Sequence, residues 1–146
     1  MIIDSAFKAD HLALIEIWES SVRATHDFLP EENITTLKPL ILNHYFDAVD
    51  LRVAKGDDGI IVGFIGVAQG NVEMLFISPE CRHGGIGSLL LKHAIKYQAA
   101  DKVDVNEQNP DAIGFYQHLG FEVIDRSALD GQGNPFPLLH MKLVQK

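Results

Sequence analysis

The residues with the clearest chemical potential form a glycine-rich run from Arg82 to Ser88, which reads Arg-His-Gly-Gly-Ile-Gly-Ser. An apolar stretch typical of a strand, residues 72–77, precedes this run, and one typical of a helix, residues 89–95, follows it. Glycine lets a backbone approach a phosphate closely, and the free N–H groups of a helix N-terminus point toward such an anion. This arrangement predicts a site for a phosphorylated ligand.

Two common nucleotide-binding loops do not match the run. No Gly-Lys-Ser/Thr sequence follows the glycines, as a P-loop requires. The spacing Arg-x-x-Gly-x-Gly also differs from the Gly-x-Gly-x-x-Gly fingerprint of dinucleotide-binding folds. Considered alone, the run is explained equally well by a tight turn that uses glycine for its shape.

A second segment follows the run after one predicted helix. It contains Asn-x6-Tyr, from Asn109 to Tyr116, and continues as Phe-Tyr-x-x-Leu-Gly-Phe up to Phe121. In this order and at this separation, the two segments resemble the motifs of the GCN5-related N-acetyltransferase (GNAT) family. Three further segments, residues 24–29, 105–109 and 135–139, are similar to those of a small bacterial member of that family.

The resemblance implies an N-acetyltransferase that moves an acetyl group from acetyl-CoA to a primary amine by direct attack in a ternary complex. The family pattern assigns donor binding to these positions: Leu75, Phe76, Ile77, Arg82, His83, Gly84, Gly85, Ile86, Gly87, Ser88, Asn109 and Tyr116. Many relatives carry glycine and then a cation where this chain has His83 and Gly84. We therefore expect donor binding to be weaker or more sensitive to pH.

Acetyl transfer to an amine requires an acid for the leaving thiolate and a base for the attacking amine. Tyr116 matches the family's tyrosine that protonates the thiolate. Glu73 and Asp104 are the candidate bases, with a chain of water molecules as an alternative. With a period of two, Glu73 shares a face with Leu75 and Ile77, where partial burial would raise the pKa of its carboxyl group. A solvated strand residue is an equally good interpretation of either acid.

The acceptor site is the least defined part of the prediction. His26 and Asp27 lie near the end of the first predicted helix and are candidate substrate-binding residues, although such a pair is also typical of a helix end. We expect residues 26–34 and 130–136 to border the site. A small amine, a peptide N-terminus and a lysine side chain all remain open as acceptors.

Periodicity and turn residues predict the elements that position these residues. Strands are expected at residues 1–7, 51–55, 60–68, 72–77, 102–106, 121–127 and 138–144, and helices at 9–25, 30–44, 86–98 and 110–119, with a break near Pro39. This order predicts a three-layer α/β (α+β) fold of the GNAT type. Its mixed, mostly antiparallel sheet would have about seven strands and about four flanking helices, in one domain covering residues 1–146.

Composition narrows the possible partners. The formal net charge of −8 disfavours nucleic-acid binding, which needs clustered cations. Cys81 is the single cysteine, so no internal disulfide is possible, and neither a membrane span, a secretory signal nor a metal-ligand spacing is evident. We expect a cytoplasmic enzyme with no metal, and a homodimer is the default among the oligomeric states that stay open. The alternative is a module that binds or senses acyl-CoA without efficient transfer.

Overall fold

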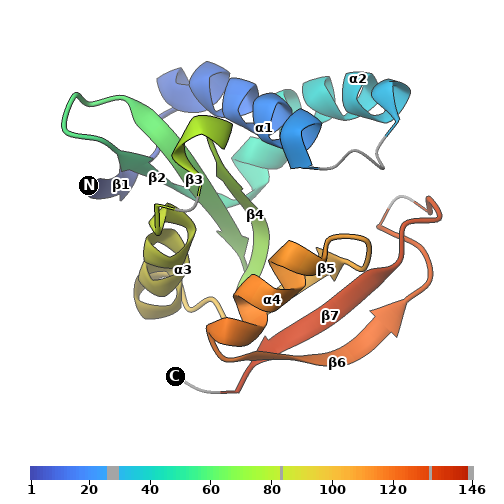
Figure 1. Cartoon of the computed structure of the whole chain (residues 1–146). Coiled ribbons are helices and arrows are strands. Elements are labelled where there is room, and N and C mark those ends of the chain that lie inside the picture. The colour runs from blue at the N-terminus through green and yellow to red at the C-terminus, as the bar shows by residue number, and fades with distance from the viewer. Residues whose placement is uncertain (26–29, 83, 132, 145–146) are drawn as a thin grey trace.

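The protein is built on a seven-stranded sheet with the order β1-β2-β3-β4-β5-β7-β6 (Figure 1). The computed structural model describes residues 1–25, 30–82, 84–131 and 133–144. The strands are β1 (Ile2–Ser5), β2 (Asp50–Lys55), β3 (Ile61–Ala68), β4 (Asn71–Ile77), β5 (Lys102–Asn106), β6 (Phe121–Ser127) and β7 (Leu138–Leu143). Neighbouring strands are antiparallel except for β4 and β5, which are parallel. The predicted fold class and the order of the elements are confirmed.

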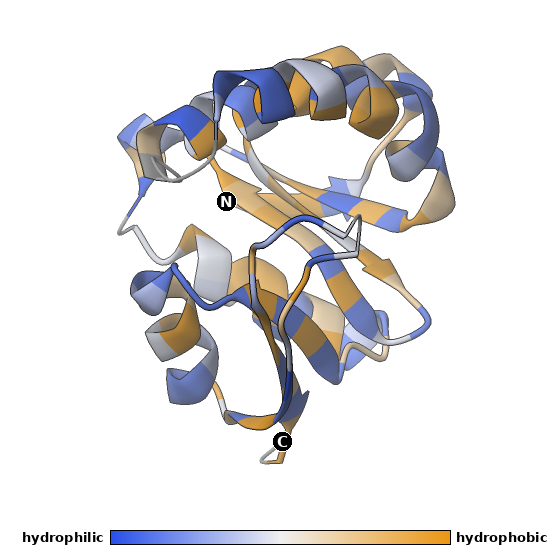
Figure 2. Ribbon diagram, turned by 90° about the vertical axis from the view of Figure 1, so that its right-hand side faces the viewer, coloured by the Kyte–Doolittle hydropathy of each residue, from blue (hydrophilic) through white to orange (hydrophobic). Residues whose placement is uncertain are grey.

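Helices cover both faces of the sheet. They are α1 (His11–Thr25), α2 (Glu31–Leu40), α3 (Ile86–Tyr97) and α4 (Pro110–His118), with short helical segments η1 (Lys8–Asp10), η2 (Ile41–Tyr45), η3 (Phe46–Ala48) and η4 (Pro79–Cys81). Helix α1 packs with η2 and η3 on one face, and α3 and α4 pack on the other. In Figure 2 the helices carry both apolar and polar segments, as expected for helices with one buried side.

The alternation of side chains along the strands divides the core into two clusters. Phe64 belongs to the cluster under α1, whereas its neighbour Ile65 belongs to the cluster under α3 and α4. Both side chains are fully buried. Successive residues of a strand point to opposite faces, so one central strand contributes to both cores.

The predicted break at Pro39 is confirmed. Pro39 lies inside α2, which ends at Leu40, and the chain continues as a wide π-type turn, η2, and then as the tighter η3. Proline lacks an N–H group and its ring crowds the preceding turn, so Pro39 removes one bond of the regular ladder. The Ile41 N–H group still donates to the Leu37 carbonyl, and the α-helical pattern then gives way to the π-type turn. The turn brings Ile41 and Phe46 into the core under α1.

Strand β4 carries the irregularity that matters most for the site. Its register with β3 passes from the pair Gly66–Met74 to the pair Val67–Val72, so Glu73 has no partner of its own in β3. This is a β-bulge, which adds one residue and interrupts the alternation of faces. Val72 therefore packs in the cluster under α3, although Met74 and Phe76 pack under α1.

Strands β4 and β5 separate soon after they meet. Their described pairing consists of Asn71 with Lys102 and Val72 with Val103, after which the two strands diverge. The residues that follow on each strand therefore present main-chain groups toward an opening in the sheet.

In the part of the chain that the structure describes, no helix is both long enough and apolar enough to cross a membrane.

Candidate active site

Within the described part of the glycine-rich run, one residue adopts a left-handed conformation at the start of α3, as the prediction of an anion site requires. Gly85 is the N-cap residue with φ = 81°, a conformation that glycine adopts without strain. As the N-cap residue, Gly85 has no side chain that could cap this end of α3, and the first bond within the helix runs from Leu89 N–H to the Gly85 carbonyl. The N–H groups of Ile86, Gly87 and Ser88 come before that bond and point out of the helix end.

A second glycine of the run lies beside α4. A methyl group added at Gly87 would lie 3.4 Å from Cζ of Phe115, which is an ordinary van der Waals contact, so packing against α4 does not by itself require glycine there. Arg82 is half-buried at the end of η4 and Gly84 is exposed, while His83 lies outside the described residues.

The opening between β4 and β5 lies next to this helix end. Leu75, Phe76 and Ile77 are half-buried on β4, and β3 pairs with β4 along its other edge. Beyond Val72 the edge of β4 that faces β5 is not paired with that strand. Such an edge offers N–H and C=O groups at the spacing that an extended ligand rich in amide groups can match.

Tyr116 lies on α4, in the core cluster against which Leu75 and Ile77 of β4 also pack. Only 7% of its surface is exposed, and its ring packs edge-on against Phe115 and Phe121, with centroids 5.1 and 5.6 Å away. Burial raises the pKa of the Tyr116 hydroxyl above its usual value. The phenol therefore keeps its proton, as a proton donor must, although the ring also serves as a core side chain.

Asn109 has a clear local role. It is the N-cap of α4, and its side-chain oxygen accepts a hydrogen bond of 3.2 Å from the Ala112 N–H group. Pro110 follows at the first helical position, where its missing N–H group has no consequence. This cap sets the start of the helix that carries Tyr116, and its predicted contact with the donor stays a prediction.

Glu73 differs from the prediction in two respects. Its side chain is exposed, so the expected partial burial is wrong. It also does not share the face of Leu75 and Ile77, because the bulge turns it toward α1. There it lines a cavity of about 400 Å³ together with residues that include Trp18, Ile41, Tyr45, Met74 and Phe76. Among the described residues that line this cavity, Glu73 is the only charged one.

Asp104 follows the last pair between β4 and β5. Val103 and Val105 on either side of it are buried under α3 and α4, so Asp104 points to the opposite face. Its Oδ1 atom lies 2.6 Å from Nδ1 of His140 on β7, and Nε2 of the same ring lies 2.6 Å from the Ser127 hydroxyl on β6. No local sequence signal marks His140 or Ser127, and only the pairing of β5, β7 and β6 brings them to Asp104.

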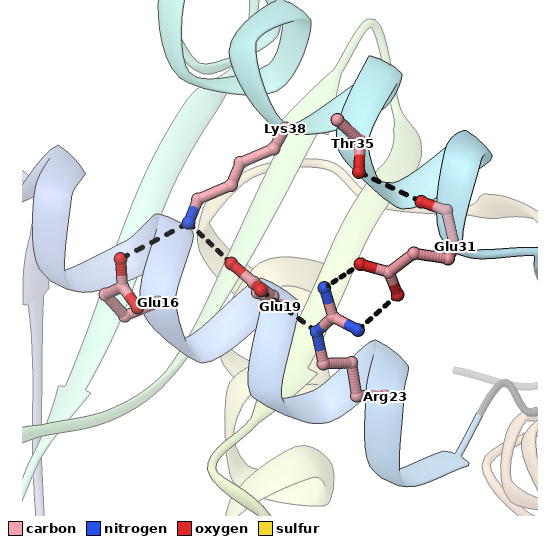
Figure 3. Close-up of polar contacts among 6 residues, drawn as sticks. All are labelled: Glu16, Glu19, Arg23, Glu31, Thr35 and Lys38. Carbon is pink, nitrogen blue, oxygen red and sulfur yellow. Dashed lines mark hydrogen bonds and ion pairs between the residues drawn. The ribbon is translucent and has the colours of Figure 1, made fainter.

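The two remaining candidates, His26 and Asp27, lie outside the described residues. The helices on either side of them, α1 and α2, are joined by an ion-pair network (Figure 3). Arg23 donates to Glu31 and Glu19, and Lys38 also donates to Glu19. Lys38 first and then Arg23 hold the pKa of the Glu19 carboxyl below its usual value. This network joins α1 to α2, and one of its members, Glu31, lies within the segment predicted to border the acceptor.

Metal coordination has no support in the described part of the chain, where no group of three or more His, Cys, Asp or Glu side chains is arranged to hold an ion. The described candidate residues offer main-chain donors, a protonated phenol, two carboxylates and an imidazole.

Comparison with protein families gives a match that runs from just before β2 into the first residues of β6. Residues 47–123 match the model described as an acetyltransferase (GNAT) domain. The matched range includes the α3 N-terminus, the opening between β4 and β5, and Tyr116.

Individual relatives agree over nearly the whole chain. The chain is 41% identical over 128 residues to the peptidyl-lysine N-acetyltransferase YjaB of Salmonella typhimurium, covering 88% of each protein. The solution structure of apo YjaB from Escherichia coli superposes with a TM-score of 0.88 at 37% identity, covering 100% of both chains. An N-acetyltransferase from Thermoplasma acidophilum, solved in complex with coenzyme A, shares the fold with a TM-score of 0.73 at 23% identity, covering 98% of this chain and 99% of that one.

Proposed function

The chain belongs to the acetyltransferase (GNAT) family, and on this basis we propose that it transfers an acetyl group from acetyl-CoA to the side-chain amine of a lysine in a peptide or protein. Residues 1–146 would act as one N-acetyltransferase domain, in which the amine attacks directly in a ternary complex. The observation that carries the proposal is the opening between β4 and β5 beside the uncapped start of α3.

The described residues fit the donor at both ends of this opening. The N–H groups at the start of α3 would hold the pyrophosphate, because the helix end attracts negative charge. The free edge of β4 at Leu75, Phe76 and Ile77 would pair with the amides of the pantetheine arm. When bound, acetyl-CoA supplies the thioester that the amine attacks. Tyr116, whose pKa is raised by burial, would deliver a proton to the leaving sulfur.

The cavity beside β4 supports a lysine as the acceptor. Aromatic side chains of Trp18, Tyr45 and Phe76 border it, and Glu73 contributes a carboxylate. A lysine side chain combines an apolar stem with a terminal ammonium group, so it matches both properties of this wall. The Salmonella relative named as a peptidyl-lysine N-acetyltransferase supports the same acceptor class.

The test is an acetylation assay with the purified chain, acetyl-CoA and a peptide that has a blocked N-terminus and one lysine. We expect release of the coenzyme A thiol and a mass increase of one acetyl group on that lysine. The matched control peptide carries arginine in place of lysine. Acetylation of an unblocked N-terminus alone would contradict the lysine assignment. Tight binding of coenzyme A without transfer to any amine would favour the acyl-CoA-binding module instead.

A further inference from the structure

The cavity of about 400 Å³ beside β4 has a single charged group on an otherwise uncharged wall, counting the described residues that line it. Trp18, Tyr45 and Phe76 supply its aromatic side chains, and Glu73 supplies the charge. Helix α1 crosses β3 and β4 at this place (Figure 1). Throughout the described ranges of the chain, no side chain donates to the Glu73 carboxylate, whereas that of Glu31 is bound by an arginine. The Glu73 carboxylate is therefore available to a ligand that enters the cavity.

The bulge in β4 places this charge where the opening between β4 and β5 begins. Glu73 follows Val72, the last residue of β4 in the described pairing with β5. The bulge turns Glu73 toward α1, on the sheet face opposite α3, whose N-terminus is assigned to the pyrophosphate of the donor. An acceptor that reaches the opening through the cavity therefore passes the carboxylate.

Entry of an acceptor changes the surroundings of this carboxylate. Glu73 is exposed, so water solvates it before an acceptor enters. An alkyl stem that lies against the apolar wall displaces this water, and a carboxylate without water or a partner is costly. An ammonium group at the end of the stem restores a charged partner, whereas an uncharged end does not. The cavity therefore favours amines that enter as cations.

Acetyl transfer removes the charge to which this site responds. The ammonium group and the thioester become a neutral amide, a free thiol and one proton, which is released to solvent. The amide N–H group can still donate a hydrogen bond to Glu73, but the amide carries no charge to offset that of the carboxylate. The acetylated product is therefore bound less tightly than the lysine from which it is formed.

We propose that Glu73 is a specificity-determining residue, which binds the ammonium group of the acceptor lysine and loses its hold on the side chain once acetylation has removed the charge. This proposal rests on the acetyl transfer proposed above. The role concerns binding and product release and is separate from that of a base, because it is expressed in dissociation constants measured without any chemical step.

Trp18 makes the binding step measurable without catalysis. It is the single tryptophan of the chain and it lines the cavity, so its fluorescence reports on a ligand that enters there. The protein is saturated with coenzyme A, which carries no acetyl group, and titrated with capped lysine, capped Nε-acetyl-lysine and capped norleucine. Wild type should bind the lysine ligand about tenfold more tightly than the other two, as expected for one hydrogen bond between charged groups.

Two substitutions at Glu73 separate its charge from its size. Glu73→Gln keeps the length of the side chain and removes the charge, so the affinities for the three ligands should come within about twofold of one another. Glu73→Asp keeps the charge and should retain most of the preference for lysine. Because Glu73 is exposed, both variants are expected to fold, and thermal unfolding checks this.

Two control variants change other properties. Glu122→Gln, at an exposed residue of β6 outside the cavity, changes the net charge equally and should leave all three affinities unchanged. Val49→Ala trims the apolar wall of the cavity. It should weaken the binding of lysine and of acetyl-lysine by a similar factor, because both ligands have the same stem, and so keep their ratio.

Steady-state kinetics with the blocked lysine peptide extend the test to turnover. In wild type the acetylated peptide should be a weak competitive inhibitor, with an inhibition constant about tenfold above the dissociation constant of the lysine peptide. In Glu73→Gln the KM for the lysine peptide should rise about tenfold, whereas the inhibition constant of the acetylated peptide should change less than about twofold.

Failure of this proposal and failure of the proposed function give different results. If Glu73→Gln lowers kcat but keeps the wild-type preference for lysine over acetyl-lysine, Glu73 acts in the chemical step, the specificity role is wrong and the proposed function stands. Wild-type Trp18 fluorescence that responds to none of the ligands, or to all three equally, also overturns the specificity role. A wild type that transfers acetyl to no amine overturns the proposed function and the account of product release, while the titration still decides whether Glu73 selects for the cation.

Discussion

At the scale of single residues, Tyr116 combines two roles that are separable by experiment. Its ring belongs to the core under α3 and α4, whereas its hydroxyl group is the proposed proton donor. Tyr116→Phe keeps the packing and removes the donor. We expect kcat for acetyl transfer to fall about 100-fold, with the dissociation constant of coenzyme A within about twofold of wild type. The measurements are steady-state kinetics and calorimetry.

Tyr97→Phe is the control for this prediction, because Tyr97 is 60% exposed on α3 and lies outside the proposed site. It should leave kcat unchanged. A Tyr116→Phe variant with wild-type turnover would remove Tyr116 from the mechanism and leave it as a packing residue.

The residues of the candidate site differ in how readily the sequence predicts them. The start of α3 and Tyr116 were predictable, because each belongs to a motif contained within about eight residues of chain. The exposure of Glu73 was not, because a bulge in β4 turns that side chain to the other face. His140 was missed because it contacts Asp104 across 36 residues of sequence, through a strand register that local patterns do not contain.

At the scale of elements, the turn that begins α3 depends on one backbone conformation. Gly85 has φ = 81°, and a residue with a Cβ atom pays about 1–2 kcal/mol to adopt it. Gly85→Ala should therefore misplace the N–H groups at the start of α3 and weaken coenzyme A binding about tenfold, as measured by calorimetry.

Gly114→Ala is the matched control at a glycine with ordinary backbone angles. Gly114 is exposed within α4, and an added methyl group would meet nothing within 4 Å. Alanine favours helix more than glycine does, so this variant should gain about 0.5–1 kcal/mol of stability in urea unfolding. Equal coenzyme A affinity in the two variants would contradict the role given to Gly85.

Helix α3 is also tied to the sheet by a contact that is sensitive to pH. Nε2 of His93 on α3 lies 3.1 Å from Nη1 of Arg52 on β2, so the ring accepts from the guanidinium only when it is neutral. Burial, and then the charge of Arg52, lower the pKa of His93 below its usual value of about 6.5. The unfolded chain thus binds a proton more readily than the folded chain at this position.

Neutral His93 therefore contributes to the stability of the folded chain above about pH 6.5. This contribution is lost as the pH falls through the lower pKa that His93 has in the folded state. His93→Gln keeps a neutral acceptor near Arg52 and removes the titration. Thermal unfolding between pH 7.5 and 5 should show a smaller fall in Tm for His93→Gln than for wild type. The same fall in both proteins would show that His93 does not contribute to acid sensitivity.

Most elements were predictable from the sequence because local signals mark their limits. The strands at residues 102–106 and 121–127 occur within the predicted bounds, and the break at Pro39 follows from the missing N–H group. The early separation of β4 and β5 was not visible in either strand's own pattern. The point at which β4 and β5 separate depends on how many residues of these two distant segments pair. The number of pairs is in turn set by the packing of the whole sheet.

At the scale of the whole molecule, charge favours a cationic acceptor. The chain has 20 acidic and 12 basic residues, apart from histidine. Attraction to a positively charged peptide weakens as salt screens these charges. At saturating acetyl-CoA, kcat/KM for a lysine peptide with basic flanks should fall about two- to fivefold between 0.05 and 0.5 M NaCl. A peptide with acidic flanks should show the opposite trend, and equal salt dependence would exclude a steering role for the net charge.

The opening between β4 and β5 has a consequence for how proteins of this shape diversify. Its border consists of main-chain N–H and C=O groups, which any residue other than proline supplies in full. The donor recognition proposed there would then depend on the backbone path rather than on particular side chains. Residues around the cavity and on the outer strands would be free to change, and so to admit new acceptors, without loss of the proposed acyl donor.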